Sequence, residues 1–128
     1  MTIRATELDV GKTVCVIEDD ELVRAHLCDL LRADGHTVLE AESADQGIDL
    51  IRTERADVAI VDILMPDRDG LEAIGQLRRT RPDLRIIAIS GGGRVGPDVY
   101  LTLARQVGAD ASLTKPISDA DLRTAVEG

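Results

Sequence analysis

The stretch DVAIVDILMPDRDG, residues 57–70, decides the fold of this chain. Its apolar run at residues 58–61 is short and rich in β-branched side chains, which is typical of a strand buried on both faces in a parallel sheet. The run ends in the carboxylate of Asp62, and Pro66 and Gly70 then stop further strand pairing. Because functional groups in open α/β sheets lie just beyond the carboxyl ends of the strands, we predict that Asp62 is a functional residue.

Short apolar runs of the same kind recur along the chain, and segments with helical spacing separate them. The predicted strands are residues 13–17, 36–40, 58–61, 85–89 and 110–114. Capping and stop signals predict helix ends at Gly35, Ser43, Pro97, Gly108 and Ser118. The predicted core stripes of the helices include Val23, Leu27 and Leu31, then Ile48 and Ile51, then Leu71, Ile74 and Leu77 on a helix at 70–79, and finally Leu122 and Val126. Five β–α units imply one parallel sheet with right-handed crossovers and helices on both faces.

Length and composition narrow the class of protein. A chain of 128 residues predicts one domain, with residues 1–12 as a lead-in and residues 13–128 as the folded unit. The net charge of −9 argues against binding to nucleic acid or to an anionic membrane. No apolar run approaches the ~20 residues of a membrane span. Cys15 and Cys28 lack metal-binding spacing, which predicts reduced thiols and a cytoplasmic location.

Polar residues follow the predicted strands at the same end of the sheet. They are Glu18, Asp19, Asp62, Ser90 and Lys115. Two carboxylates ~4 Å apart repel by about 4 kcal/mol at an effective dielectric of about 20, so three of them require a compensating cation. Lys115 neutralises part of this charge. A hard divalent ion with oxygen ligands suits the remainder, and Mg²⁺ is the cofactor that we predict.

The first β–α turn excludes the common nucleotide-binding folds. Flavin and dinucleotide binders place a glycine-rich or hydroxyl-rich loop there to receive phosphate. In this chain the turn contains four acids, residues 18–21, which repel phosphate unless a metal ion intervenes. The glycines at residues 91–93 lack the lysine and hydroxyl of a P-loop.

Over residues 13–126 the sequence resembles the receiver domain of two-component response regulators. The motifs that carry the resemblance are VIEDD at 16–20, VDILMPDRDG at 61–70, ISG at 89–91 and LTKPI at 113–117. Their occurrence in this order, each at the end of a predicted strand, makes the resemblance specific. It implies a flavodoxin-like (βα)5 fold with a five-stranded parallel sheet in the order 2-1-3-4-5.

The resemblance also assigns roles to the residues at the strand ends. It implies that Asp62 is the phosphoacceptor, that Ser90 hydrogen-bonds the phosphoryl oxygens and that Lys115 pairs with them. The implied Mg²⁺ ligands are Glu18, Asp19, Asp62 and the backbone carbonyl of Leu64. The Lys115–Pro116 peptide bond is expected to be cis.

The implied function is a signalling switch and not an enzyme that acts on other substrates. A histidine kinase or histidine phosphotransfer protein would donate the phosphoryl group to Asp62. The surface of the fourth helix, fifth strand and fifth helix would then change and regulate an unknown partner protein. Since the sequence ends soon after the fifth helix, we expect a stand-alone regulator that is monomeric or a weak phosphorylation-dependent dimer. A phosphotransfer intermediate or phosphate sink without an output target is the alternative, and a metal-dependent phosphatase is a weaker one.

Three positions depart from the pattern of many relatives. Ser112 stands where relatives commonly carry an aromatic residue that moves on activation. Leu64 and Gly92 stand where the resemblance places residues that flank the path of a hydrolytic water. Neither side chain can orient water by hydrogen bonding, so we expect a long-lived phosphorylated form.

Overall fold

The computed structural model describes residues 11–65, 70–91 and 97–128. The elements are β1 (Thr13–Ile17), α2 (Glu21–Ala33), β2 (Thr37–Ala41), α3 (Ala44–Glu54), β3 (Val58–Asp62), α4 (Gly70–Thr80), β4 (Arg85–Ser90), α5 (Pro97–Val107), β5 (Ala111–Thr114) and α6 (Asp119–Glu127). The predictions for most of the lead-in, for the turn after Asp62 and for most of the glycine-rich loop concern residues 1–10, 66–69 and 92–96, which lie outside the described residues.

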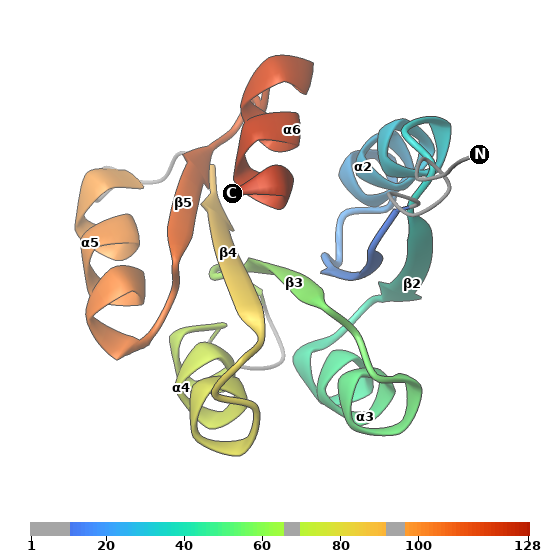
Figure 1. Ribbon diagram of the computed structural model, residues 1–128. Coiled ribbons are helices and arrows are strands. Elements are labelled where there is room, and N and C mark those ends of the chain that lie inside the picture. Colours follow the sequence, from blue (N-terminus) through green and yellow to red (C-terminus); the bar gives the residue numbers. More distant parts are fainter. Residues whose placement is uncertain (1–10, 66–69, 92–96) are drawn as a thin grey trace.

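Five parallel strands form one sheet in the order β2-β1-β3-β4-β5 (Figure 1). The central strand β3 is buried along its whole length, as the apolar run predicts. Its register aligns Val61 with Ile17 of β1 and Asp62 with Ile89 of β4. The predicted doubly wound, flavodoxin-like α/β fold is therefore confirmed.

Two hydrophobic cores lie on opposite faces of the sheet. Helices α2 and α6 cover one face, and α3, α4 and α5 cover the other (Figure 1). Alternation along β1 supplies both cores, since Cys15 and Ile17 face α3 and α4 whereas Val14 and Val16 face α2 and α6. The core is aliphatic, and each fully buried isoleucine or leucine contributes roughly 1.5–3 kcal/mol of burial free energy.

The helices begin and end close to the predicted signals, and Asp20 is a further cap that was not predicted. Asp20 caps α2 by accepting hydrogen bonds from two backbone N–H groups of its first turn. Gly35 follows that helix with φ of +91°, a left-handed conformation that glycine adopts without strain. Ser43 and Ser118 cap α3 and α6 through their hydroxyl groups. In the described part of the chain, none of the helices combines the length and the hydropathy that a membrane span requires.

Some sequence predictions need correction. The second strand was expected at residues 36–40 but is Thr37–Ala41, and the fifth was expected at residues 110–114 but is Ala111–Thr114. The first pair of the β1–β2 ladder is Thr13 with Thr37, and the side chain of His36 accepts the N–H of Lys12. The core stripe of α3 was expected to be Ile48 and Ile51; Ile51 is buried and Ile48 is half-buried against the same core. Two small residues that were not predicted, Ala44 and Gly47, complete the buried face of this helix. A side chain at Gly47 would overlap Ile17, so this helix approaches the sheet too closely for a larger residue.

Candidate functional site

The carboxyl ends of the strands form a polar rim on an otherwise apolar sheet. Ile17 and Val61 are register partners in adjacent parallel strands, so the residues that follow each of them become neighbours. One ligand atom from each of Glu18, Asp19 and Asp62 lies within 4.8 Å of the others. The predicted convergence of three carboxylates at this rim is confirmed.

Lys115 crosses from the end of β5 to these carboxylates. Its Nζ lies 2.7 Å from Oε1 of Glu18 and donates a hydrogen bond of 3.2 Å to Oδ2 of Asp62. Burial lowers the pKa of Lys115, but its contacts with Glu18 and Asp62 outweigh that effect and raise the pKa overall. Lys115 is therefore a positive charge held at the carboxylate of Asp62.

The Asp62 carboxylate is buried and held at both oxygens. Oδ1 accepts a 3.0 Å hydrogen bond from the backbone N–H of Leu64, while Oδ2 accepts from Lys115. The side chain is thus orientated before any partner arrives. A carboxylate held in one orientation is suited to act as a nucleophile, because it loses little conformational freedom when it attacks.

The acidic cluster has unused capacity for a cation. Glu18 is fully buried, and burial followed by its contact with Asp62 raises the pKa of its carboxyl group. Burial and the nearby Glu18 also raise the pKa of Asp19. Within the described residues Oε1 of Glu18 makes an ion-pair contact but no directed hydrogen bond. Three carboxylates this close together, with one ammonium group between two of them, fit a hard divalent cation such as Mg²⁺, which Glu18, Asp19 and Asp62 would hold.

Ser90 ends β4, which pairs with β3. It is fully buried, and its Oγ has no hydrogen-bond partner among the described residues. Its backbone oxygen accepts a 2.8 Å hydrogen bond from the N–H of Lys115, which joins the ends of β4 and β5. The Lys115–Pro116 bond is cis, as predicted. The backbone N–H of Leu64 donates a hydrogen bond to the Asp62 carboxylate. The metal-binding role of the Leu64 carbonyl stays a prediction.

Two glycines at the rim have a role that the sequence analysis missed. A Cβ at Gly70 would overlap the backbone of Asp62 and Ile63, so the start of α4 packs directly on the segment that begins at Asp62. A Cβ at Gly91 would lie 2.9 Å from Cδ of Lys115. The available signal was that each glycine ends one of the motifs that carry the family resemblance.

Comparisons with known proteins agree with this arrangement. A family model for the response regulator receiver domain matches residues 14–127. The transcriptional regulatory protein PdtaR of Mycobacterium tuberculosis is 33% identical, over 99% of this chain and 62% of its own length. The sensor kinase CckA of Brucella abortus is 33% identical, over 97% of this chain and 13% of its own length. The chain thus spans less than two thirds of these curated relatives.

Solved structures give the same result. The CheY-like receiver domain protein of Methanospirillum hungatei superposes with a TM-score of 0.83 at 26% identity, covering 91% of both chains. A putative response regulator of Chloroflexus aurantiacus gives a TM-score of 0.82 at 25% identity, covering 91% of this chain and 95% of that one. The chain belongs to the response regulator receiver domain family.

Proposed function

We propose that this domain accepts a phosphoryl group on Asp62 from a phosphohistidine of a partner protein, in a reaction that requires Mg²⁺. Receiver domains belong to two-component signalling systems and are not classical enzymes, and response regulators interact with histidine kinases and downstream targets. The observation that carries the proposal is the position of Lys115 Nζ, in contact with both Glu18 and Asp62. In this proposal residues 13–128 form the receiver unit and residues 1–12 precede it.

The chemistry is a phosphoryl transfer between two nucleophiles. An oxygen of Asp62 forms a bond to phosphorus while the phosphorus–nitrogen bond of the donor breaks, and the electron pair stays on the imidazole nitrogen. Lys115 offsets the negative charge of the arriving phosphoryl oxygens. The Oγ of Ser90, buried and without a partner among the residues described, is available to donate a hydrogen bond to one of them. Mg²⁺ held by the acidic cluster supplies further charge neutralisation.

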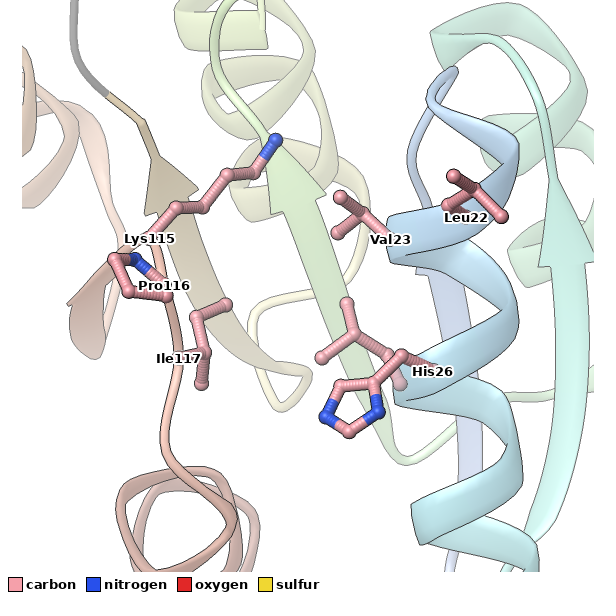
Figure 2. Close-up of a pocket in the computed structure, with 7 residues that line it drawn as sticks. Leu22, Val23, His26, Lys115, Pro116 and Ile117 are labelled. Atoms are coloured by element: carbon pink, nitrogen blue, oxygen red, sulfur yellow. The ribbon is translucent and has the colours of Figure 1, made fainter.

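An apolar groove beside the rim suits the docking of the donor. It has a volume of about 300 Å³ and lies between α2 and the segment that follows β5. Figure 2 shows Leu22, Val23 and His26 on one side of it, and Lys115 and the residues after it on the other. Lys115 lines both the groove and the acceptor site. We therefore place an amphipathic helix of the donor in this groove, with its phosphohistidine directed to Asp62.

Phosphorylation would change the contacts that Lys115 and Ser90 make at the ends of β5 and β4. The new negative charge competes with Glu18 for the ammonium group and offers Ser90 a hydrogen-bond acceptor. Because the ends of β4 and β5 are hydrogen-bonded to each other, both strands would respond together. The adjoining helices α5 and α6 would transmit the change to a downstream protein.

The acceptor is tested by phosphoryl labelling of the whole chain with acetyl phosphate and with a phosphorylated kinase. Asp62→Asn should lose essentially all label, and removal of Mg²⁺ with a chelator should do the same to the wild type. The matched control is Asp29→Asn, an exposed carboxylate on α2, which should be labelled normally. Stable wild-type labelling of Asp62→Asn, or labelling that persists without divalent ions, would contradict the proposal.

The donor groove is tested by a charge on its rim. Leu22 is 82% exposed, so Leu22→Asp should leave the fold intact while disrupting apolar contacts with a protein donor. Labelling by the phosphorylated kinase should fall about tenfold, corresponding to roughly 1.4 kcal/mol. Labelling by acetyl phosphate, which needs no docking surface, should not change. An equal loss with both donors would place the effect in the acceptor site and not in the groove.

A further inference from the structure

The acidic turn between β1 and α2, residues 18–20, is held by hydrogen bonds to the backbone of its first residue. The N–H of Glu18 donates a 3.0 Å hydrogen bond to the carbonyl of Ala41 at the end of β2. The carbonyl of Glu18 accepts a 2.8 Å hydrogen bond from Nη1 of Arg24. This carbonyl belongs to the peptide unit that joins Glu18 to Asp19. A side chain from the beginning of α2 therefore fixes the link between two of the three clustered carboxylates.

Arg24 is itself anchored to the edge of the sheet. Its Nε lies 3.4 Å from Oε1 of Glu40, and its side chain is only 13% exposed. Glu40 lies on the edge strand β2, where it aligns with Val16 of β1, and α2 lies against this strand. The guanidinium group thus joins an acceptor at the end of β1 to an acceptor on β2. Both contacts are made from one rigid planar group, which limits the freedom of the acidic turn.

We propose that Arg24 is a positioning residue for the cation site, which holds the peptide between Glu18 and Asp19 so that both carboxylates stay close to Asp62 before a divalent cation binds. Carboxylates that repel one another would move apart if this peptide could rotate freely. Groups that orientate metal ligands typically change metal affinity by about 10–100-fold. The inference deepens the proposed function and rests on it, because the cation is the Mg²⁺ of the proposed phosphoryl transfer.

The charge of Arg24 acts in the opposite direction to its positioning effect. A guanidinium group repels a cation, so removal of the charge alone would tighten Mg²⁺ binding. Glu40 offsets part of this charge, and salt screens what remains. The loss of positioning is therefore the larger effect, and removal of the Arg24 side chain should weaken Mg²⁺ binding. The sign of the change in dissociation constant separates the two roles.

The test measures the Mg²⁺ dissociation constant of the unphosphorylated full chain, from the amide chemical shifts of residues 18–20 in an NMR titration. Arg24→Met keeps the aliphatic stem but removes every donor, and it should weaken Mg²⁺ binding about tenfold. Arg24→Lys can donate to one acceptor but cannot span both, so its dissociation constant should lie between those of Arg24→Met and the wild type. The same comparison holds for Arg24→Lys alone if Arg24→Met does not fold. At saturating Mg²⁺, labelling by acetyl phosphate should return to the wild-type rate.

The matched control is Arg32→Met, on the same helix. Arg32 also contacts Glu40, at 3.0 Å, but its side chain is 48% exposed and, within the described residues, it donates to Glu40 and not to the acidic turn. This variant should bind Mg²⁺ as the wild type does.

Unchanged or tighter Mg²⁺ binding by the Arg24 variants, or an equal loss in Arg32→Met, would overturn the positioning role and leave the proposed function standing. Labelling that stays slow at saturating Mg²⁺ would also overturn it, by placing the effect outside the cation site. Wild-type labelling of Asp62→Asn would instead contradict only the proposed acceptor, because the Mg²⁺ titration does not depend on labelling. A wild type that binds no Mg²⁺ would overturn both.

Discussion

At the amino ends of the strands, Arg78 donates hydrogen bonds to the backbone oxygens of Gly108, Pro82 and Leu84, all between 2.8 and 3.0 Å. It also contacts Asp110, whose carboxylate accepts the N–H of Ile86. At the carboxyl ends the polar groups crowd together and remain partly unsatisfied. There, Oγ of Ser90 has no hydrogen-bond partner among the described residues, and Oε1 of Glu18 contacts only the ammonium group of Lys115.

The polar groups at the amino ends of the strands therefore stabilise the fold, whereas those at the carboxyl ends form the candidate functional site. A buried polar group without a hydrogen bond costs roughly 1–3 kcal/mol, so such groups are retained where a ligand completes them. The network around Arg78 is complete without a ligand and fixes the α4–β4 and α5–β5 loops to α4. The acidic rim keeps polar groups that the proposed cation and phosphoryl group would complete. The following predictions test this contrast.

The largest effect on stability is expected at the amino ends. The side chain of Arg78 is 25% exposed, and Arg78→Ala would remove a donor from three carbonyl groups and leave the Asp110 carboxylate with the N–H of Ile86 but no cationic partner. We expect a loss of about 2–4 kcal/mol in the free energy of unfolding, measured by urea denaturation. Arg78→Lys should recover little of it, because an ammonium group cannot span the same acceptors.

The control for this prediction is the next residue. Arg79 is exposed, and Arg79→Ala should change stability by less than about 0.5 kcal/mol. A loss at Arg78 no larger than the loss at Arg79 would show that the hydrogen-bond network at this end contributes nothing. The proposed division between the two ends would then have no energetic basis.

The sequence predicted the reactive end better than the stabilising end. Glu18, Asp62 and Lys115 each follow a strand directly, so alternation of strands and helices was enough to bring them together. Arg78 lies on a helix and Asp110 precedes an edge strand, and both resemble ordinary solvated residues in the sequence. Their pairing depends on how α4 and α5 pack, which hydrophobic periodicity does not specify.

The errors in the fold have related causes. Periodicity weighs large apolar residues, so it favoured Ile48 and overlooked Ala44 and Gly47, which allow the close approach of α3 to β1. The neighbours of Ser112 were not predicted either. Ser112 departs from the pattern of many relatives, but only the packing of α5 against β5 places Arg105 near it.

A smaller effect, of opposite sign, is expected at the acidic rim. The pKa of Glu18 is raised above its usual 4.5 by burial and by Asp62. Glu18 therefore stabilises the folded state to its full extent below pH 4.5, and this stabilisation is lost as the pH rises through the higher pKa of the folded state. In metal-free buffer, Glu18→Gln should gain stability relative to the wild type between pH 5 and pH 8. We expect its melting temperature to rise by about 3 °C relative to the wild type at the upper pH.

Glu40 provides the reverse control. Its contact with Arg32 lowers its pKa, so its contribution is present above its usual 4.5 and is lost as the pH falls. Glu40→Gln should therefore be slightly less stable than the wild type at pH 8 and equal to it in acid, by a small amount because Glu40 is 42% exposed. If the stability of both variants, relative to the wild type, changes in the same direction with pH, then ionisation of Glu18 does not destabilise the acidic rim.

The smallest effect concerns the lifetime of the phosphorylated rim. Hydrolysis of an aspartyl phosphate needs a water molecule in line with the bond that breaks, and a side chain that orientates this water accelerates the reaction. Leu64 lies two residues beyond Asp62, is 40% exposed and cannot hydrogen-bond water. Leu64→Asn keeps the backbone N–H that holds Oδ1 of Asp62 and adds a group able to orientate water. Loss of label after removal of the donor, in Mg²⁺ buffer, should become about threefold faster, or roughly 0.65 kcal/mol lower in barrier. Leu64→Met should decay at the wild-type rate, and an asparagine variant that decays no faster than this control would show that Leu64 does not limit attack by water.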